Sequence, residues 1–314
     1  MKHFPAEPHR NVPARMPELE RVVEEMCAPE YCETVFHHAL HDDPMPSLTD
    51  LHELLSRLKA ALFPGFYGPS RVRIDSMRYH MAANLDSIYR ILAEQIRRGS
   101  CFACAEQAGD CAYCSEAGDE IALQFIQSIP RIRKLLAGDV QAAFEGDPAA
   151  KTPGETIFCY PSITALIHQR AAHVLYRMGV PLIPRIITEM AHSVTGIDIH
   201  PGARIDEEFF IDHGTGVVIG ETCIIGKRCR LYQGVTLGAL SFPKENDGSL
   251  VKGADRHPVL EDHVTVYSGA TILGRVVIGR GSVIGGNLWV TRDVPPDSHL
   301  VQQQYAYNGE GGKR

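Results

Sequence analysis

The sequence lacks three features that would place it in a specialised class of protein. No apolar run among its 314 residues is long enough to span a membrane. It has no excess of positive charge, since its formal net charge is −7, whereas nucleic-acid-binding surfaces are basic. Residues 1–17 are proline-rich and polar, without the apolar segment of a secretory signal peptide. We therefore expect a cytoplasmic protein with a disordered tail at 1–17 and no affinity for membranes or nucleic acids.

Between residues 18 and 194, apolar residues recur at the spacing of helices. Ser47 is suited to cap one of these helices, with Asp50 at the third helical position. A longer helix is expected to begin near Met77 and to end at Gly99. The apolar stripes predict an α-helical domain over 18–194, with a core that includes Leu19, Val22, Val23, Met26, Leu51, Leu54, Leu55, Leu58, Ile88, Leu92 and Ile96.

Four of the nine cysteines lie in one loop of the helical domain, residues 101–114. They form two Cys-x-x-Cys pairs, and four thiolates can occupy the corners of a tetrahedron, as zinc prefers in structural sites. An iron–sulfur cluster would use the same ligands, and a metal-free loop of reduced or redox-labile thiols is the alternative. The candidate ligands are Cys101, Cys104, Cys111 and Cys114.

The C-terminal part has an apolar or compact residue at every sixth position, a period that fits neither a helix nor an ordinary strand. Such hexapeptide repeats form a three-sided parallel β-helix of about eighteen residues per coil, in which the repeated residue points inward and coils stabilise each other by stacking. We therefore predict an α+β protein: a left-handed β-helix at 195–294, with a loop at 239–258, follows the helical domain and precedes a tail at 295–314. The repeat positions are Ile199, Ile205, Ile211, Val217, Cys223, Cys229, Val235, Val259, Thr265, Thr271, Val277, Val283 and Trp289.

Polar motifs interrupt this repeat at 197–201, 211–216 and 255–258. His213 follows Asp198 by fifteen residues, which is close to one coil, so the two side chains can meet at the same edge of the β-helix. A carboxylate bound to one imidazole nitrogen leaves the other nitrogen available as a base. The alternative is that these two residues are independent polar groups at exposed corners.

Four segments, in this order, closely resemble the serine O-acetyltransferase family of hexapeptide-repeat acyltransferases. They are Asp-Ile-His-Pro at 198–201, Asp-His-Gly-Thr-Gly-Val-Val-Ile-Gly-Glu-Thr at 212–222, Gln-Gly-Val-Thr-Leu-Gly at 233–238 and Asp-Arg-His-Pro at 255–258. The resemblance covers about residues 138–296, and it includes Asp-Pro-Ala at 147–149. Asp-Arg-His-Pro is the discriminating segment, because hexapeptide repeats alone occur in many acyltransferases.

The resemblance implies acetyl transfer from acetyl-CoA to the hydroxyl group of L-serine, which gives O-acetylserine for cysteine biosynthesis. His213 would be the general base and Asp198 would orient it, without a covalent enzyme intermediate. Arg256 would hold the serine carboxylate with its guanidinium fork, and His257 would lie beside it. The alternative role for Arg256 and His257 is a loop-anchoring ion pair.

The resemblance also implies which residues bind the serine ammonium group and which bind acetyl-CoA. Asp147 and Asp212 would hold the ammonium group. Acetyl-CoA would lie in a groove between two packed β-helices, against small residues that let the backbone approach it, namely Gly238, Ala239, Ser268, Gly269 and Gly285. This chain departs from the family where Val283 replaces a lysine near the CoA phosphates, and a compensating charge would come from Arg275, Arg280 or Lys252.

The assembly expected from the resemblance is a homotrimer or a dimer of trimers, because the site needs a neighbouring coil. Many relatives enter the active site of O-acetylserine sulfhydrylase with a terminal isoleucine; Arg314 is unsuited to that apolar anchor, so we do not expect this complex. Three other functions stay open: transfer to an amino sugar or homoserine, a non-catalytic scaffold, and a γ-carbonic-anhydrase-like zinc hydro-lyase with His213, His257 and His263 as ligands.

Overall fold

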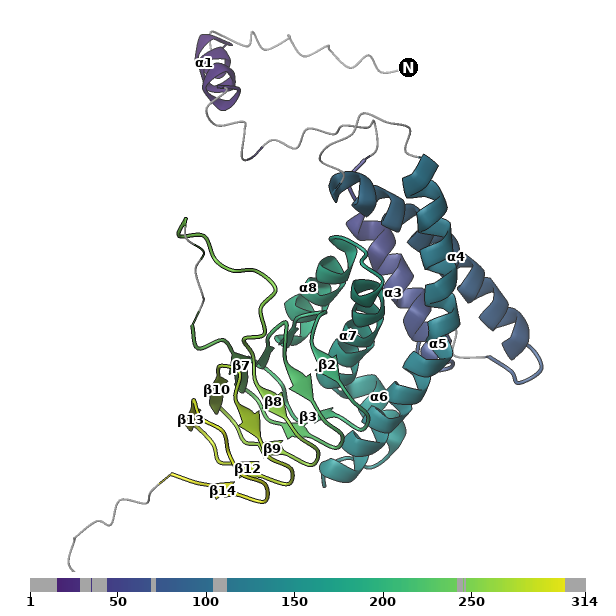
Figure 1. Cartoon of the computed structure of the whole chain (residues 1–314). Helices are drawn as coiled ribbons and strands as arrows, with labels where there is room; N and C mark the ends of the chain where they lie inside the picture. The colour runs from purple at the N-terminus through teal and green to yellow at the C-terminus, as the bar shows by residue number, and fades with distance from the viewer. Residues whose placement is uncertain are drawn as a thin grey trace, which may run out of the picture. The chain divides into compact units, whose positions relative to one another are not determined.

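In the computed structural model, the chain divides into two compact units, Met1–Asp42 and Asp43–Arg314 (Figure 1). The structure describes residues 16–28, 35, 44–68, 72–103, 112–241, 245 and 247–302, so most of the predicted tail at 1–17 lies outside the described residues. In the first unit, α1 spans Met16–Met26. Its apolar stripe was predicted to be buried, but it is exposed, with Met26 at 74%. Across the described ranges, no helix is both long and apolar enough to cross a membrane.

The described helices of the second unit are α3 (Leu48–Leu62), α4 (Met77–Ala103), α5 (Ala112–Gly146), α6 (Pro153–Cys159), α7 (Pro161–Arg177) and α8 (Ile183–Thr195). Ser47 caps α3 as predicted, because its side chain accepts a hydrogen bond of 3.2 Å from the N–H of Asp50. The prediction that α4 ends at Gly99 is wrong, since the helix continues beyond it. A Cβ atom at position 99 would lie 3.1 Å from Ile183 and from the carbonyl oxygen of Pro181, so this glycine permits close helix packing.

The C-terminal region is the predicted left-handed parallel β-helix, with three sheets as its sides. Sheet 1 has the order β1-β4-β7-β10-β13, sheet 2 the order β11-β8-β5-β2, and sheet 3 the order β14-β12-β9-β6-β3. From β1 to β13, successive strands enter the three sheets in rotation. The strands are β1 (Asp198–Ile199), β2 (Arg204–Ile205), β3 (Phe210–Ile211), β4 (Val218–Ile219), β5 (Ile224–Ile225), β6 (Arg230–Leu231), β7 (Thr236–Gly238), β8 (Val259–Leu260), β9 (Thr265–Val266), β10 (Thr271–Leu273), β11 (Val277–Ile278), β12 (Val283–Ile284), β13 (Trp289–Val290) and β14 (His299–Leu300).

The strand register corrects the predicted phase of the repeat after the loop. Ile199 pairs with Ile219 on the next coil, and Ile219 pairs with Leu237 on the coil after that. The first coil is two residues longer than the second, because its corner at 212–217 is enlarged. Trp289, which was predicted to point inward, is 70% exposed. Successive residues of a strand point to opposite faces, so a shift of one residue exchanges inside and outside. The inward residues after the loop are Leu260, Val266, Ile272, Ile278, Ile284 and Val290.

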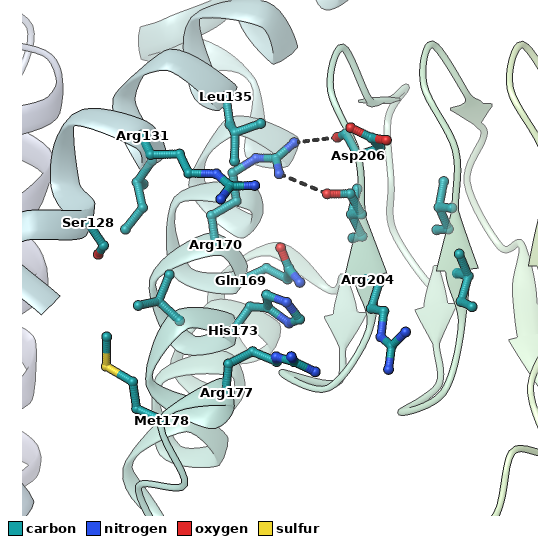
Figure 2. Close-up of a pocket in the computed structure, with 15 residues that line it drawn as sticks. Ser128, Arg131, Leu135, Gln169, Arg170, His173, Arg177, Met178, Arg204 and Asp206 are labelled. Atoms are coloured by element: carbon teal, nitrogen blue, oxygen red, sulfur yellow. Dashed lines mark hydrogen bonds between the residues drawn. The ribbon is translucent and has the colours of Figure 1, made fainter. Parts of the chain in front are cut away.

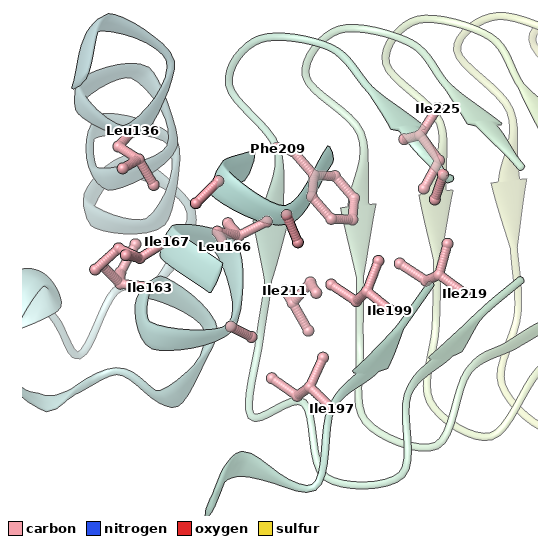
Figure 3. Close-up of a cluster of buried hydrophobic side chains, with 14 of the residues drawn as sticks. Leu136, Ile163, Leu166, Ile167, Ile197, Ile199, Phe209, Ile211, Ile219 and Ile225 are labelled. Atoms are coloured by element: carbon pink, nitrogen blue, oxygen red, sulfur yellow. The ribbon is translucent and has the colours of Figure 1, made fainter. Parts of the chain in front are cut away.

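One hydrophobic core runs from the helices into the β-helix, across the boundary predicted near residue 194. Figure 3 shows Leu166 of α7 facing the first coil, where Ile197, Ile211 and Phe209 fill the interior, whereas Ile167 lies on the side of α7 toward Leu136. At the far end, β14 pairs with β12 inside the segment that was predicted to be a tail. The helices therefore close one end of the stack of coils, and β14 belongs to its last coil.

A buried ion pair joins the helices to the first coil. Arg170 on α7 donates two hydrogen bonds to the carboxylate of Asp139 on α5, at 2.6 and 2.7 Å. The same guanidinium donates to the carbonyl oxygens of Ile205 and Asp206, at 3.1 and 2.9 Å, and the N–H of Phe209 donates to Asp139 at 3.0 Å. Burial raises the pKa of Asp139, whereas Arg170 and the Phe209 amide oppose that shift. These contacts fix the turn after β2 against both helices.

Candidate active site

The predicted site residues lie on two different edges of the β-helix. The His213 edge is the corner between sheets 3 and 1, and consists of residues 212–217, 232–235, 267–270 and 285–288. The Arg256 edge is the corner between sheets 1 and 2, and its described residues are 200–203, 220–223, 239–241, 245, 247–258 and 274–276. Sheet 1 separates these two edges, so one chain presents two groups of polar side chains rather than one.

His213 projects from a corner with an unusual backbone. Its φ angle is 56°, and those of Gly214 and Gly216 are 94° and 77°. A left-handed conformation is strained for a residue other than glycine, and such strain is often found at functional positions. A Cβ atom on Gly214 would also collide with the side chain of Ile197, so that position requires glycine. The side chain of His213 is 72% exposed, which leaves the imidazole accessible to a substrate.

Two carboxylates lie beside His213. Asp212 Oδ1 is 3.9 Å from His213 Nε2. Asp147, in the turn after α5, accepts hydrogen bonds from the hydroxyl of Tyr160 and, at 2.8 Å, from the N–H of Ala149. These two hydrogen bonds lower the pKa of Asp147, and the neighbouring His213 adds to the shift, so the carboxylate is ionised at neutral pH. The structure thus brings together Asp147, Asp212 and His213 in a cluster that can bind a cation.

On the Arg256 edge, an ion pair fixes the orientation of the arginine. Arg256 Nη2 lies 2.7 Å from Glu221 Oε2, and Arg256 Nη1 donates to the carbonyl oxygen of Ala254 at 3.2 Å. Glu221 also accepts a hydrogen bond of 2.9 Å from the hydroxyl of Tyr176 on α7. Burial raises the pKa of Glu221, but the hydrogen bonds from Arg256 and Tyr176 outweigh it and lower the pKa. The loop-anchoring ion pair is therefore present, and it leaves Nε–H and two further N–H groups of Arg256 to meet a carboxylate.

His257 is held in one neutral form. The backbone N–H of Thr222 donates to His257 Nδ1 at 3.1 Å, so this nitrogen is an acceptor and the proton of the neutral ring is on Nε2. The Thr222 hydroxyl lies 2.9 Å from the same nitrogen. Burial, followed by the charge of Arg256, lowers the pKa of His257 to about 4. His257 is therefore a hydrogen-bond donor at neutral pH, and it is not available as a cation.

The structure does not show the predicted contact between Asp198 and His213. Among the described residues, no hydrogen bond or ion pair joins them. The carboxylate of Asp198 lies on the outer face of β1, where Arg185 Nη1 is 3.7 Å from Oδ1. Glu189 and His192 of α8 have side-chain atoms close to it. The orienting role of Asp198 stays a prediction.

The residues predicted to bind acetyl-CoA divide over the same two edges. Gly238 is the last residue of β7 and Ala239 begins the Arg256 edge, whereas Ser268, Gly269 and Gly285 belong to the His213 edge. A stacked pair of tyrosines, Tyr232 and Tyr267, continues the His213 edge above Asp212, with ring centroids 4.9 Å apart. Arg275, one candidate for the missing charge near the CoA phosphates, is already bound to Asp255 at 3.2 Å and to the carbonyl oxygens of Thr222 and His257.

The four-cysteine metal site predicted from sequence lies largely outside the described residues, so it stays a prediction. Cys104 and Cys111 lie outside the described residues, as does the side chain of Cys114, and Cys101 is in α4. In the described ranges, the metal-compatible grouping of side chains is Glu189, His192 and Asp198, which includes none of the three histidines proposed as zinc ligands. His213, His257 and His263 follow or precede strands of different sheets, and so they occupy three different corners.

Sequence reasoning missed several residues that position the predicted ones. Tyr160 holds Asp147, Glu221 holds Arg256, and Thr222 sets the tautomer of His257. Glu221 and Thr222 lie within the family-like segment 212–222, which was a usable signal. Tyr160 had no such signal, because its contact with Asp147 depends on how α6 folds back from α5.

Comparisons with known proteins give a consistent result, although no family model matches the chain. A protein of Synechococcus elongatus named "Serine acetyltransferase, plasmid" is 50% identical over 273 residues, which is 85% of this chain and 86% of the relative. The serine acetyltransferase of Mycobacterium tuberculosis is 46% identical over 166 residues, 53% of this chain and 69% of that one. The crystal structure of Entamoeba histolytica serine acetyltransferase 1 in complex with L-cysteine superposes with a TM-score of 0.70 at 35% identity, over 92% of this chain and 100% of the other. The chain therefore belongs to the serine acetyltransferase family.

Proposed function

We propose that this protein transfers the acetyl group of acetyl-CoA to the hydroxyl of L-serine, giving O-acetylserine and CoA in the cytoplasm, as a step of cysteine biosynthesis. The observation that carries the proposal is the exposed imidazole of His213 beside the carboxylates of Asp147 and Asp212. An amino acid that carries a hydroxyl group fits this cluster, because its ammonium group can be held by the carboxylates while the hydroxyl meets the base. The names of the relatives support the same substrate.

In the proposed mechanism, His213 takes the proton of the serine hydroxyl as its oxygen attacks the thioester carbonyl of acetyl-CoA. The tetrahedral intermediate then collapses, the C–S bond breaks, and the thiolate of CoA leaves. Asp198 would orient His213 and stabilise its imidazolium form. Direct transfer is favoured because Cys223, the cysteine on the Arg256 edge, is a poor nucleophile: burial raises its pKa to about 12.

The Arg256 edge would bind the other end of serine. Glu221 and Ala254 hold the guanidinium of Arg256 in one orientation, which reduces the entropy lost when it binds the serine carboxylate. His257 would donate a hydrogen bond from Nε2 to a substrate oxygen, since its other nitrogen already accepts one. The proposed reaction assigns no step to the four cysteines of 101–114, where a metal would be structural.

A complete site would require two copies of the chain. His213 and three of the acetyl-CoA residues are on one edge, and Arg256 and the other two are on another edge of the same β-helix. The outer face of sheet 1 between these edges exposes Trp289 at 70% and Val218 at 37%, which suits packing against another chain. A homotrimer, alone or as a dimer of trimers, would place the His213 edge of each chain against the Arg256 edge of the next.

The shared site predicts complementation between inactive variants. His213→Ala and Arg256→Ala should each lose activity alone, whereas trimers refolded from a mixture should regain part of it, because some interfaces combine both wild-type edges. The measurement is acetyl transfer after co-refolding, with each variant refolded separately as the control. Recovery no greater than the sum of the separate variants would show that one chain supplies both edges of each site.

Gly220→Ala is expected to impair serine binding with little effect on acetyl-CoA. A Cβ atom at position 220 would overlap the ring of His257, so the ring must move away from Thr222. We expect kcat/KM for serine to fall by about ten- to a hundredfold, the range for a misplaced substrate-positioning group. The matched control is Gly138→Ala, where the nearest atom is Cγ of Glu208 at 3.3 Å. Equal kinetics for both variants would contradict the role of His257.

The decisive assay of the proposed function is thiol release from acetyl-CoA with different acceptors. We expect release with L-serine, and much less with homoserine or an amino sugar, because their hydroxyl and amine lie at other distances from the carboxylates and the base. Thiol release with an amino sugar but not with L-serine would show that the acceptor is an amino sugar. Binding of CoA without thiol release would favour a non-catalytic role.

A further inference from the structure

We propose that a cavity of about 700 Å³ between the helices and sheet 2, next to residues 200–203 of the Arg256 edge, binds a small organic phosphate. Its walls are α5, α7, β2 and β5, and it includes none of the residues assigned to serine or acetyl-CoA. The volume lies within the range of sites that enclose small molecules, about 300–1,000 Å³. The inference does not depend on the proposed catalytic reaction.

A row of nitrogen-bearing side chains lines one wall of the cavity. Gln169, His173 and Arg177 are spaced by four residues on α7, so they share one face of that helix, and Figure 2 shows them pointing toward β2. Arg204 extends from β2 on the facing wall, and Arg131 reaches in from α5. Side chains from three separate elements thus converge on one space.

The charges in this cavity are not balanced by the protein. Arg131, Arg177 and Arg204 form no ion pair among the described residues. All three side chains are exposed to solvent. The buried Arg170 differs, because Asp139 and two carbonyl oxygens of the first coil engage its guanidinium. Asp206 is the one acidic residue of the lining, so three available guanidinium groups face a single carboxylate. The cavity therefore favours an anion.

His173 provides a second sign of positive potential in the cavity. Its Nδ1 lies 2.8 Å from the carbonyl oxygen of Pro201, which leaves Nε2 directed away from that contact. Burial lowers the pKa of His173, the hydrogen bond to Pro201 opposes that shift, and the charges of Arg177, Arg170 and Arg204 lower the pKa further. An anion bound in the cavity would offset the charges of these arginines and raise the pKa of His173. The pKa of His173 can therefore show whether the cavity is occupied.

The chemistry of the walls indicates an organic phosphate rather than a simple anion. A guanidinium fork matches phosphate oxygens in a bidentate arrangement, and a phosphoryl group has enough acceptor oxygens to meet several arginines. Between the arginines, the lining is apolar, with Ile132, Leu135, Val174 and Ile224. A ligand that fills the cavity therefore has a phosphoryl end and a less polar body.

The test is binding of ADP to the full-length protein by calorimetry, in the presence of saturating CoA so that the co-substrate site is occupied. Adenosine serves as the uncharged probe and citrate as the carboxylate probe. We expect ADP to bind, and the variant Arg177→Ala/Arg204→Ala to bind it at least about tenfold more weakly. The matched control, Arg133→Ala/Arg292→Ala, removes two exposed charges outside the cavity and should change the affinity by less than about twofold.

A second measurement follows the ring of His173 by NMR. Saturation with ADP should raise the pKa of His173 in the wild type, and should leave it unchanged in the double cavity variant. Single variants Arg177→Gln and Arg204→Gln replace the double variant if it does not fold. The proposal is overturned by equal loss in the control variant, by equal affinity for adenosine or citrate, or by no ADP binding up to about 10 mM in the presence of CoA. None of these measurements depends on acetyl transfer, so failure of this proposal is distinguishable from failure of the proposed function.

Discussion

The variant His213→Ala is expected to lower turnover by about two to four orders of magnitude, the usual contribution of a positioned general base. The imidazole is the exposed base of its edge, and the neighbouring groups Asp147 and Asp212 are carboxylates that bind cations rather than accept the hydroxyl proton. The measurement is the steady-state rate of thiol release at saturating serine and acetyl-CoA. The KM for acetyl-CoA should change little, because its predicted contacts are with other residues.

The control for this experiment is His263→Ala. His263 also has a positive φ angle, 63°, and is exposed at a corner, but on the third edge of the β-helix, away from both site edges. Its removal should change turnover by less than about twofold. Near-normal turnover of His213→Ala, or an equal loss in both variants, would contradict the assignment of the base.

Asp139→Ala is expected to lower the free energy of unfolding by about 3–5 kcal/mol, the usual result of leaving one partner of a buried ion pair without the other. Both partners are almost fully buried, with side-chain exposures of 0% for Asp139 and 3% for Arg170. The substitution also removes the acceptor of the Phe209 N–H. Urea-induced unfolding at neutral pH measures the loss.

Two controls separate burial from charge. Glu53→Ala breaks the exposed pair with Arg57 on α3, and should cost less than about 1 kcal/mol, because solvent screens that pair. The double variant Asp139→Leu/Arg170→Met replaces the buried pair by apolar groups, and should recover much of the stability lost by Asp139→Ala. If Asp139→Ala costs no more than Glu53→Ala, the pair does not stabilise the junction.

The fold class could be predicted from the sequence because its signals are local. A six-residue repeat specifies a β-helix wherever it occurs, and the leucines at 51, 54, 55 and 58 form a stripe that is buried as expected. Ser47 caps its helix through a contact three residues away. The prediction of which residues point inward after the loop was wrong. It depends on how many extra residues the corner at 212–217 and the loop contain, and the local six-residue pattern does not show these numbers.

The composition of the candidate site was predictable only in part, for a related reason. The family-like segments identified His213, Asp147 and Asp212, which the fold gathers on one edge. The resemblance assigned Arg256 and His257 to the same substrate, but within one chain the two groups belong to corners on either side of sheet 1. Which corner a residue occupies follows from the sheet that its strand enters, and that requires the complete count of coils.

The junction at Asp139 and Arg170 also bears on recombination between homologous genes. Because the guanidinium bonds to the backbone of the turn after β2, a hybrid that joins foreign helices to this β-helix at residue 194 would separate the ion pair from the carbonyl groups it satisfies. A crossover placed before α5 would keep Asp139 and Arg170 in the same parental segment as the turn after β2 that they bind. We therefore expect viable chimaeras to inherit α5, α7 and the first coil as one block.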